Sequence, residues 1–233
     1  MSTKVMRRRL GRLYAKDKND KKFPLKALLP RRKSQRTSRS WYDAYWNGNQ
    51  GNTPKCVGYG WTHWLEDAPV IPGSKTHPAV DPNKVYKLAQ QLDEWPGTNY
   101  DGSSVRGGAK AIRKLGFISA YHWAANLDEI IQWILEKGPV VVGTIWTEDM
   151  FTPNASGLIV PTGEVVGGHC YDLNGVSTIT RKFRAKNSWG TSWGKGGHAY
   201  IKFEDMNTLL FPSSGEPGEA CVATEKGVVS PKQ

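Results

Sequence analysis

The chain has 233 residues, of which 38% are hydrophobic and 11% aromatic, and its formal net charge is +11. This length and apolar content suffice for a packed core and exclude an intrinsically disordered chain. No apolar run reaches the ~18 residues that a membrane-spanning helix needs, and no apolar stretch of about 7–15 residues follows the basic N-terminus as it would in a secretory signal. We therefore expect a protein outside the membrane that is made without Sec-type export. Three cysteines give no disulfide framework and fit a reducing compartment.

Most of the positive charge lies at the N-terminus. Residues 1–40 carry 15 Lys and Arg against two Asp, a net +13, whereas the other 193 residues carry −2. Such a basic arm is most often a solvated tail, and the alternative is that it binds nucleic acid or another polyanion by neutralising phosphates. Its more apolar piece, residues 23–30, could instead lie extended on the body or near a cleft.

The chain after this arm begins with helical patterns. Val57, Trp61, Trp64 and Leu65 have the spacing of a core-facing helix over residues 57–66. Further helices are predicted at 83–92, 108–114 and 127–137. The last of these has Asn126 as its N-cap, Glu129 three residues later, and Gly138-Pro139 at its end.

From Val140 onward the pattern changes to β-branched runs separated by polar or Gly-rich turns. Strands are predicted at 140–145, 168–173, 183–186 and 199–203. Helices followed by strands predict an α+β fold with two lobes and a cleft between them. We expect a domain over 41–225, with a helical lobe at about 41–138, an antiparallel sheet or barrel at about 139–225, and a tail at 226–233.

Two side chains near the first predicted helix are candidates for chemistry. Cys56 begins that helix, where unpaired amides and the macrodipole favour a thiolate. Gln50, six residues earlier, carries an amide that could donate to a developing oxyanion. A lone buried cysteine is more often an inert core residue, so this interpretation needs a base elsewhere in the chain.

The second half of the chain supplies that base and a group to orient it. His169 lies at the start of a predicted strand, and Asn187 lies in the run from Lys186 to Gly194. Packing of the two lobes could bring a Cys, a His and an Asn together although they are far apart in sequence. The thiolate would then attack an acyl carbon, the imidazole would carry the proton, and the Asn amide would fix the ring.

The run Lys-Asn-Ser-Trp-Gly-Thr-Ser-Trp-Gly at 186–194, with Gln50, Cys56 and Gly168-His169, resembles the papain family of cysteine peptidases. The separation of 113 residues between Cys56 and His169 agrees with that family. The resemblance covers roughly residues 41–225. It implies a papain-like two-lobe fold, with an endopeptidase that cleaves proteins or peptides through a thioester acyl-enzyme. It implies no cofactor, and the histidines outside position 169 show no metal-ligand spacing.

Residue roles follow from this resemblance. Cys56 corresponds to the nucleophile, His169 to the base, Asn187 to the orienting amide, and Gln50 to the side-chain donor of the oxyanion hole. Trp189 matches the indole that covers the bond between His and Asn. The cleft residues expected from position are Gly167, Gly102 and Ser103, which would bound the pocket for the side chain two residues before the cut, and Trp193, which would line the leaving-group side.

The sequence departs from the family pattern beside the nucleophile. Thr53-Pro54-Lys55 replaces the usual small residues and half-cystine, and Val57 replaces the usual Trp. Such variants resemble a bacterial and phage branch that works in reducing surroundings, which predicts a cytoplasmic or virion-associated protein. Forty residues are too few for the family's helical prosegment, so either nothing holds the activity back or the basic arm does so in a shorter form. The alternatives are a catalytically silent papain-fold binding module and a polyanion-binding protein that acts through residues 1–40.

Overall fold

The structure, a computed structural model, describes residues 8–41, 46–67, 78 and 80–225. The predicted tail at 226–233 lies outside these residues. The α-helices are α1 (Cys56–Asp67), α2 (Pro82–Leu92), α3 (Val105–Lys114), α4 (Leu127–Glu136) and α5 (Phe203–Leu210). The strands are β1 (Ser38–Ser40), β2 (Ile118–Trp123), β3 (Val140–Thr147), β4 (Val165–Ser177), β5 (Lys182–Lys186), β6 (His198–Lys202) and β7 (Glu219–Glu225). Three short 3-10 helices, η1 (Lys18–Lys22), η2 (Leu25–Leu28) and η3 (Glu148–Phe151), complete the elements.

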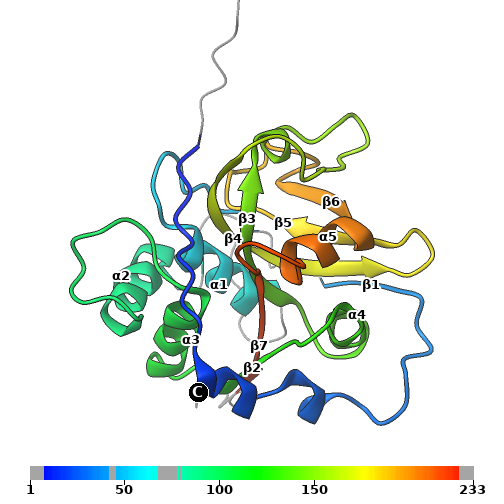
Figure 1. Cartoon of the computed structure of the whole chain (residues 1–233), viewed down its shortest axis with the longest axis horizontal. Coiled ribbons are helices and arrows are strands. Elements are labelled where there is room, and N and C mark those ends of the chain that lie inside the picture. The colour runs from blue at the N-terminus through cyan, green and yellow to red at the C-terminus, as the bar shows by residue number, and fades with distance from the viewer. Residues whose placement is uncertain (1–7, 42–45, 68–77, 79, 226–233) are drawn as a thin grey trace, which may run out of the picture.

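The strands form one antiparallel sheet in the order β2-β7-β3-β4-β5-β6, and β1 pairs with β4. Helices α1, α2 and α3 gather beside this sheet, whereas α4 and α5 lie toward its other side (Figure 1). Two apolar cores correspond to these two groups of helices. The predicted α+β class, with helices before an antiparallel sheet, is confirmed.

Capping residues explain where two of the helices begin. The Asn126 side chain accepts from the Glu129 amide at 3.0 Å, which confirms the predicted N-cap of α4. Helix α3 begins at Val105, three residues before its predicted start, because Ser104 Oγ accepts from the Gly107 amide at 2.8 Å. A Cβ at Gly108 would lie 2.1 Å from Trp61 Cδ1, so glycine at this position allows α3 to pack closely on α1.

Among the strands and α-helices, the sequence reasoning missed β1, β2, β7 and α5. Strand β2 lies in the helix-rich half of the chain, and its partner β7 is about a hundred residues away. Local pattern does not reveal such a pairing, because the strand is completed by a distant segment. The predicted strand at 199–203 ends one residue early, since Phe203 begins α5 with Glu204 and Asp205 in its first turn, where the helix dipole favours acidic side chains.

Residues 8–40 of the basic arm pack against the body, and the interpretation of a solvated tail is wrong for this part of the chain. Leu25 is fully buried in the core beside α4. The Trp123 amide donates to the Phe23 carbonyl at 2.9 Å, which fixes the arm to the edge of β2. Near the end of the arm, β1 pairs with Gly175–Ser177 of β4.

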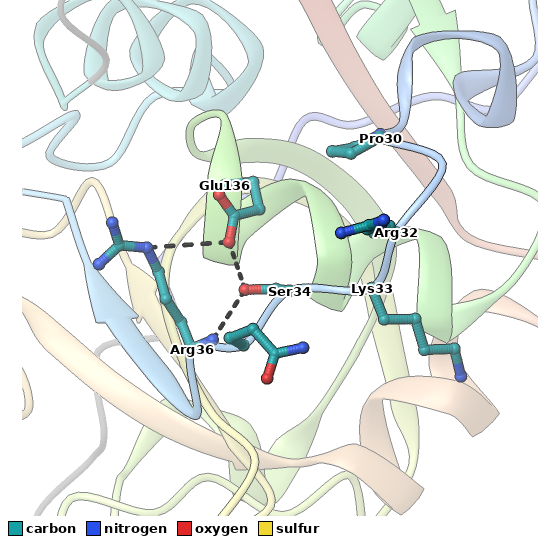
Figure 2. Close-up of a pocket in the computed structure, with 7 residues that line it drawn as sticks. Pro30, Arg32, Lys33, Ser34, Arg36 and Glu136 are labelled. Atoms are coloured by element: carbon teal, nitrogen blue, oxygen red, sulfur yellow. Dashed lines mark hydrogen bonds and ion pairs between the residues drawn. The ribbon is translucent and has the colours of Figure 1, made fainter.

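The arm also contacts α4 at a shallow surface pocket of about 420 Å³. The Ser34 hydroxyl donates to Glu136, the last residue of α4, and Arg36 Nε lies 3.8 Å from the same carboxylate (Figure 2). The Ser34 amide donates to Gln132 Oε1 at 2.7 Å. These contacts hold the arm on the side of α4. No helix among the described residues has the length and apolar character needed to cross a membrane.

Candidate active site

Cys56 is the first residue of α1 and is fully buried. Burial raises the pKa of its thiol to about 11. The backbone amides of Cys170, Gly11 and Val57 lie against the sulfur and oppose this rise, because a donor stabilises the thiolate. The thiol is therefore protonated at neutral pH in this state, with three amides already directed at it.

His169 lies in β4, opposite Thr144 of β3, and is fully buried. Its Nε2 lies 2.8 Å from Asn187 Oδ1, which also accepts from the Ser188 amide at 2.7 Å. Because that amide must donate to an oxygen, Asn187 presents its oxygen to the ring, and His169 Nε2 carries the proton. Burial lowers the pKa of His169 to about 4, against the opposing effect of Asn187. The ring is therefore neutral, with Nδ1 as its basic nitrogen.

The structure brings the predicted nucleophile and base to neighbouring positions. The Cys170 amide, which lies against the Cys56 sulfur, belongs to the residue directly after His169. Helix α1 packs closely on β4 here, since a Cβ at Gly60 would lie 3.0 Å from Cys170 Sγ. Among the described residues, His169 Nδ1 is buried and makes no hydrogen bond. The structure thus places both groups at the junction of α1 and β4, with the free ring nitrogen unpaired.

Gln50 is held beside the motif that contains Asn187. Its backbone amide donates to the Ser188 carbonyl at 2.8 Å, and its side-chain Oε1 accepts from the Ser188 hydroxyl. The side-chain nitrogen of Gln50, Nε2, donates to the Thr53 carbonyl at 2.7 Å and to the Arg9 carbonyl at 3.1 Å. The side-chain nitrogen is thus bonded to two peptide carbonyls, of which that of Arg9 belongs to the arm. Ser188 is a positioning residue that the sequence reasoning missed, although it lies inside the recognised motif.

Aromatic rings enclose His169. Trp189 is fully buried and stacks on the imidazole with a centroid separation of 4.9 Å. Trp146, which the sequence reasoning missed, meets the imidazole edge-on at 4.8 Å. Trp193 lies behind Trp189, edge-on at 5.3 Å, and its Nε1 donates to the Phe151 carbonyl. Trp193 thus supports the indole of Trp189 and is itself 7% exposed.

Residues 8–13 of the arm, which we call the strap, lie across these groups. The strap runs past α1 on the side of α2 and α3 (Figure 1). The Arg12 amide donates to the Gly168 carbonyl, and the Leu13 amide donates to the Ser103 carbonyl, both at 2.9 Å. The Ser103 amide in turn donates to the Gly11 carbonyl at 2.9 Å. A peptide segment of the chain itself therefore occupies the gap between Ser103 and Gly168.

The glycines predicted to bound a pocket all contact the strap. Gly102 has φ +100°, and a Cβ there would lie 2.5 Å from the Gly11 carbonyl oxygen. A Cβ at Gly167 would lie 3.2 Å from Leu10 Cδ1. Small residues at both positions therefore leave room for a peptide backbone between the lobes. Pro54, one of the departures beside Cys56, packs on Gly11. A Cβ added at Gly11 would lie 2.0 Å from the Pro54 carbonyl oxygen.

Val57, which stands in place of the usual Trp, is fully buried. A Cβ at Gly108 of α3 would lie 2.8 Å from Val57 Cγ1, so this side chain packs inside the helical lobe.

Among the described residues, no group of three or more His, Cys, Asp or Glu side chains is arranged to hold a metal ion.

Comparisons with known proteins identify the family of this chain. A family model described as papain family cysteine protease matches residues 83–212, more than half of the chain. Cathepsin B of Dictyostelium discoideum is 35% identical over 80 residues, which cover 34% of this chain and 26% of that protein. The gamete and mating-type specific protein A of the same organism is 31% identical over 78 residues, or 17% of its length. These matches thus span about a quarter or less of either relative.

Solved structures share the fold along most of the chain. Xylellain, a cysteine protease from Xylella fastidiosa, superposes with a TM-score of 0.70 at 18% identity and covers 95% of this chain and 99% of its own. Procathepsin L2 from the larval midgut of Tenebrio molitor gives a TM-score of 0.66 at 18% identity, covering 93% of this chain and 78% of its own. The predicted papain-like α+β fold is confirmed, and the chain belongs to the papain family of cysteine proteases.

Proposed function

We propose that the chain is a cysteine endopeptidase in a latent state, with Cys56 as nucleophile, His169 as base, Asn187 as the group that orients the ring, and Gln50 as an oxyanion donor. The observation that carries this proposal is the buried pair of His169 Nε2 and Asn187 Oδ1, 2.8 Å apart, whose free ring nitrogen lies beside the residue that donates to the Cys56 sulfur.

The chemistry follows from these groups. His169 Nδ1 takes the thiol proton, and the Cys56 sulfur attacks the carbonyl carbon of the substrate peptide bond. The oxyanion that forms accepts from the Gln50 amide and from the backbone amide of Cys56. Collapse of this intermediate breaks the C–N bond, and His169 gives the proton to the leaving amine. Water then adds to the thioester with His169 as base, which releases the acid and restores the thiol.

The strap explains why the site is latent. It lies against the Cys56 thiol through Gly11 and bonds Gly168, the residue before His169. Both reacting groups are fully buried, which raises the pKa of Cys56 to about 11 and lowers the pKa of His169 to about 4, so the uncharged pair is favoured. The Arg9 carbonyl of the strap also accepts from the Gln50 side chain, so this oxyanion donor is already in use. Displacement of the strap would admit water and substrate together.

The test is covalent labelling of the full chain by a vinyl sulfone or an epoxide thiol trap. We expect slow labelling of the parent and fast labelling of Arg12→Ala, a variant that removes a fully buried side chain of the strap and its ion pair with Glu219. Cys56→Ala should abolish labelling and peptide hydrolysis, and His169→Ala should lose both while it stays folded. An Arg12→Ala protein that is folded but labels no faster than free cysteine and cleaves no peptide would reject the proposal.

The full burial of Cys56 favours one alternative, a catalytically silent module whose thiol is a core residue. A silent module predicts the same slow labelling of Cys56 in the parent and in Arg12→Ala. The same experiment therefore separates the two functions.

A further inference from the structure

The turn from Gln50 to Thr53 is closed by two bonds between the same two residues. The Thr53 hydroxyl donates to the Gln50 backbone carbonyl at 2.6 Å, and Gln50 Nε2 donates to the Thr53 backbone carbonyl at 2.7 Å. Gly51 lies inside the turn at φ +60°, a conformation that glycine adopts without strain. Gln50 is 3% exposed, whereas Thr53 is partly exposed. The turn therefore joins a buried amide to a hydroxyl nearer the surface.

The bonds of the Gln50 side chain fix the direction of its amide. Nε2 carries two hydrogens, and its two acceptors are the Thr53 carbonyl and the Arg9 carbonyl of the strap. A carbonyl oxygen can only accept, so Nε2 faces Thr53, and Oε1 accepts from the Ser188 hydroxyl. Of these three bonds, displacement of the strap removes the one to Arg9. One N–H is then left aimed at the place of the Arg9 carbonyl oxygen, which is open to the oxygen of a substrate carbonyl.

The chain on either side of the turn is tied to helices. The Tyr59 hydroxyl of α1 donates to the Asn49 carbonyl at 3.2 Å, and Lys55 Nζ donates to Asn83 Oδ1 of α2 at 2.7 Å. Between these ties the turn has no covalent link, because all three cysteines are free and Thr53 belongs to the run that replaces the half-cystine of the family pattern. The shape of the turn thus depends on hydrogen bonds.

We propose that Thr53 is a positioning residue of the oxyanion hole: its hydroxyl closes the turn, so that the Thr53 carbonyl holds one N–H of Gln50 and directs the other at the reacting carbonyl oxygen. The inference rests on the proposed peptidase function. Thr53 acts through Gln50 rather than by contact with the reacting atoms. Without the hydroxyl, the two backbone segments can separate and the amide can rotate. An oxyanion donor stabilises the transition state most when it is oriented before the reaction.

The test compares Thr53→Val with Thr53→Ser in the full-length Arg12→Ala protein. Valine has nearly the shape of threonine and lacks the hydroxyl, whereas serine keeps it. The substrate is the best-cleaved member of a fluorogenic dipeptide library. We expect kcat/KM to fall by about 5- to 30-fold in Thr53→Val, which is less than the roughly 100- to 1,000-fold that loss of a whole oxyanion donor costs. Thr53→Ser should stay within about threefold of the Arg12→Ala protein, because the bond to Gln50 is kept.

Thr208→Val is the matched control. Thr208 also donates through its hydroxyl to a backbone carbonyl, that of Glu204, but it does so on the exposed side of α5. This variant should leave kcat/KM unchanged. A urea unfolding curve for each protein shows that it is folded. If Thr53→Val fails to fold, Thr53→Ala removes the same hydroxyl with a smaller side chain and takes its place in every comparison.

A pair of inhibitors separates positioning from a general loosening of the site. In a dipeptide aldehyde, the Cys56 sulfur bonds the carbonyl carbon and the thiol proton passes to the carbonyl oxygen, which then lies in the oxyanion hole. The matching dipeptide alcohol binds without a bond to sulfur. Thr53→Val should weaken the aldehyde by about the factor lost in kcat/KM and change the alcohol less than about twofold. Equal weakening of both inhibitors, or a Thr53→Ser protein as impaired as Thr53→Val, would overturn the inference.

A separate readout distinguishes failure of this inference from failure of the proposed function. Unchanged hydrolysis in Thr53→Val overturns the inference and leaves the peptidase standing. If the Arg12→Ala protein cleaves no member of the library, the function fails, and Thr53 is judged by NMR of the Gln50 side-chain amide in the parent chain, assigned by its loss in Gln50→Glu. Faster exchange of these hydrogens with water in Thr53→Val than in Thr53→Ser supports the positioning role, and equal exchange overturns it.

Discussion

The backbone amide of Gly11 lies against the thiol of Cys56. The strap therefore passes directly over the candidate nucleophile, and no water-sized path to the sulfur is left, since Cys56 has no exposed surface. The close approach depends on glycine, because a Cβ at position 11 would lie 2.0 Å from the Pro54 carbonyl oxygen. Access to the thiol is thus governed by how well the strap fits the chain just before α1.

A Gly11→Val substitution should release the strap and expose Cys56. The expected result is at least a tenfold rise in the rate of labelling by a vinyl sulfone, measured by intact-mass spectrometry. Gly138→Ala is the matched control, since its Cβ would meet only Trp133 Nε1 at 3.8 Å. Equal labelling rates in Gly11→Val and in the parent would show that the strap does not limit access.

Asn187→Ala should slow hydrolysis by about 10- to 100-fold in the Arg12→Ala background, because the imidazole loses the oxygen that fixes its orientation and tautomer. The control is a urea unfolding curve for each protein, which separates slower chemistry from loss of the fold. The pH–rate profile should also shift, since Asn187 opposes the lowering of the pKa of His169. An unchanged profile and rate would remove Asn187 from the mechanism.

Acid should act on the strap through two groups of opposite sign. Burial lowers the pKa of His169 from its usual 6.5 to about 4, so protonation between these values favours the state in which water reaches the ring. Burial raises the pKa of Glu219 from its usual 4.5 to about 7, so the seated strap favours the protonated carboxyl over a similar range. The two effects oppose each other in the parent, and removal of Glu219 should leave only the loosening by His169.

The measurement is the labelling rate of Glu219→Gln divided by that of the Glu219→Gln, Arg12→Ala double variant at each pH. Division by the double variant removes the intrinsic pH dependence of the thiol. We expect this ratio to rise as the pH falls from about 6.5 to about 4, whereas the ratio of the parent to Arg12→Ala should change less. A flat ratio in the Glu219→Gln background would show that His169 does not control the strap.

Trp146→Ala should destabilise the β lobe by about 3–5 kcal/mol, the usual cost of removing a buried large aromatic side chain. Trp146 is 1% exposed and meets both His169 and Trp189 edge-on. Urea denaturation gives the free energy of unfolding. Trp146→Phe should lower it by less than Trp146→Ala, because an aromatic ring remains in the core. A loss below about 1 kcal/mol would mean that the lobe closes around the gap.

The sequence predicted those parts of the molecule whose signals are local. Asn126 caps α4 as expected because its side chain bonds an amide three residues away. The motif around Asn187, with Gly168-His169, predicted the base and the group that orients it. Gln50 is bonded to Ser188 of the same motif. Helices α1 to α4 were found from their apolar spacing, and strands β3 to β6 from their β-branched and apolar runs.

Features that depend on distant segments were not predictable in this way. Strand β2 is a strand because β7 pairs with it, and the 3.0 Å bond between Arg12 and Glu219 joins residues 207 positions apart. In the sequence, Arg12 is one of 15 cations in the arm, and nothing local shows that its side chain is fully buried. The assignment of a bacterial and phage branch, the cellular location and the polyanion role of the arm stay predictions.

The continuity of the strap with the rest of the arm has a consequence for control. Arg106 holds the chain just beyond the strap, because it donates to the Ala15 carbonyl at 3.1 Å and pairs with Asp20. A segment tethered this closely competes as if it were present at about millimolar concentration, whatever the amount of protein in solution. Micromolar substrate cannot outcompete it by mass action. Activity in this chain is therefore expected to depend on an unlocking event, such as a cut in the strap, more than on substrate supply.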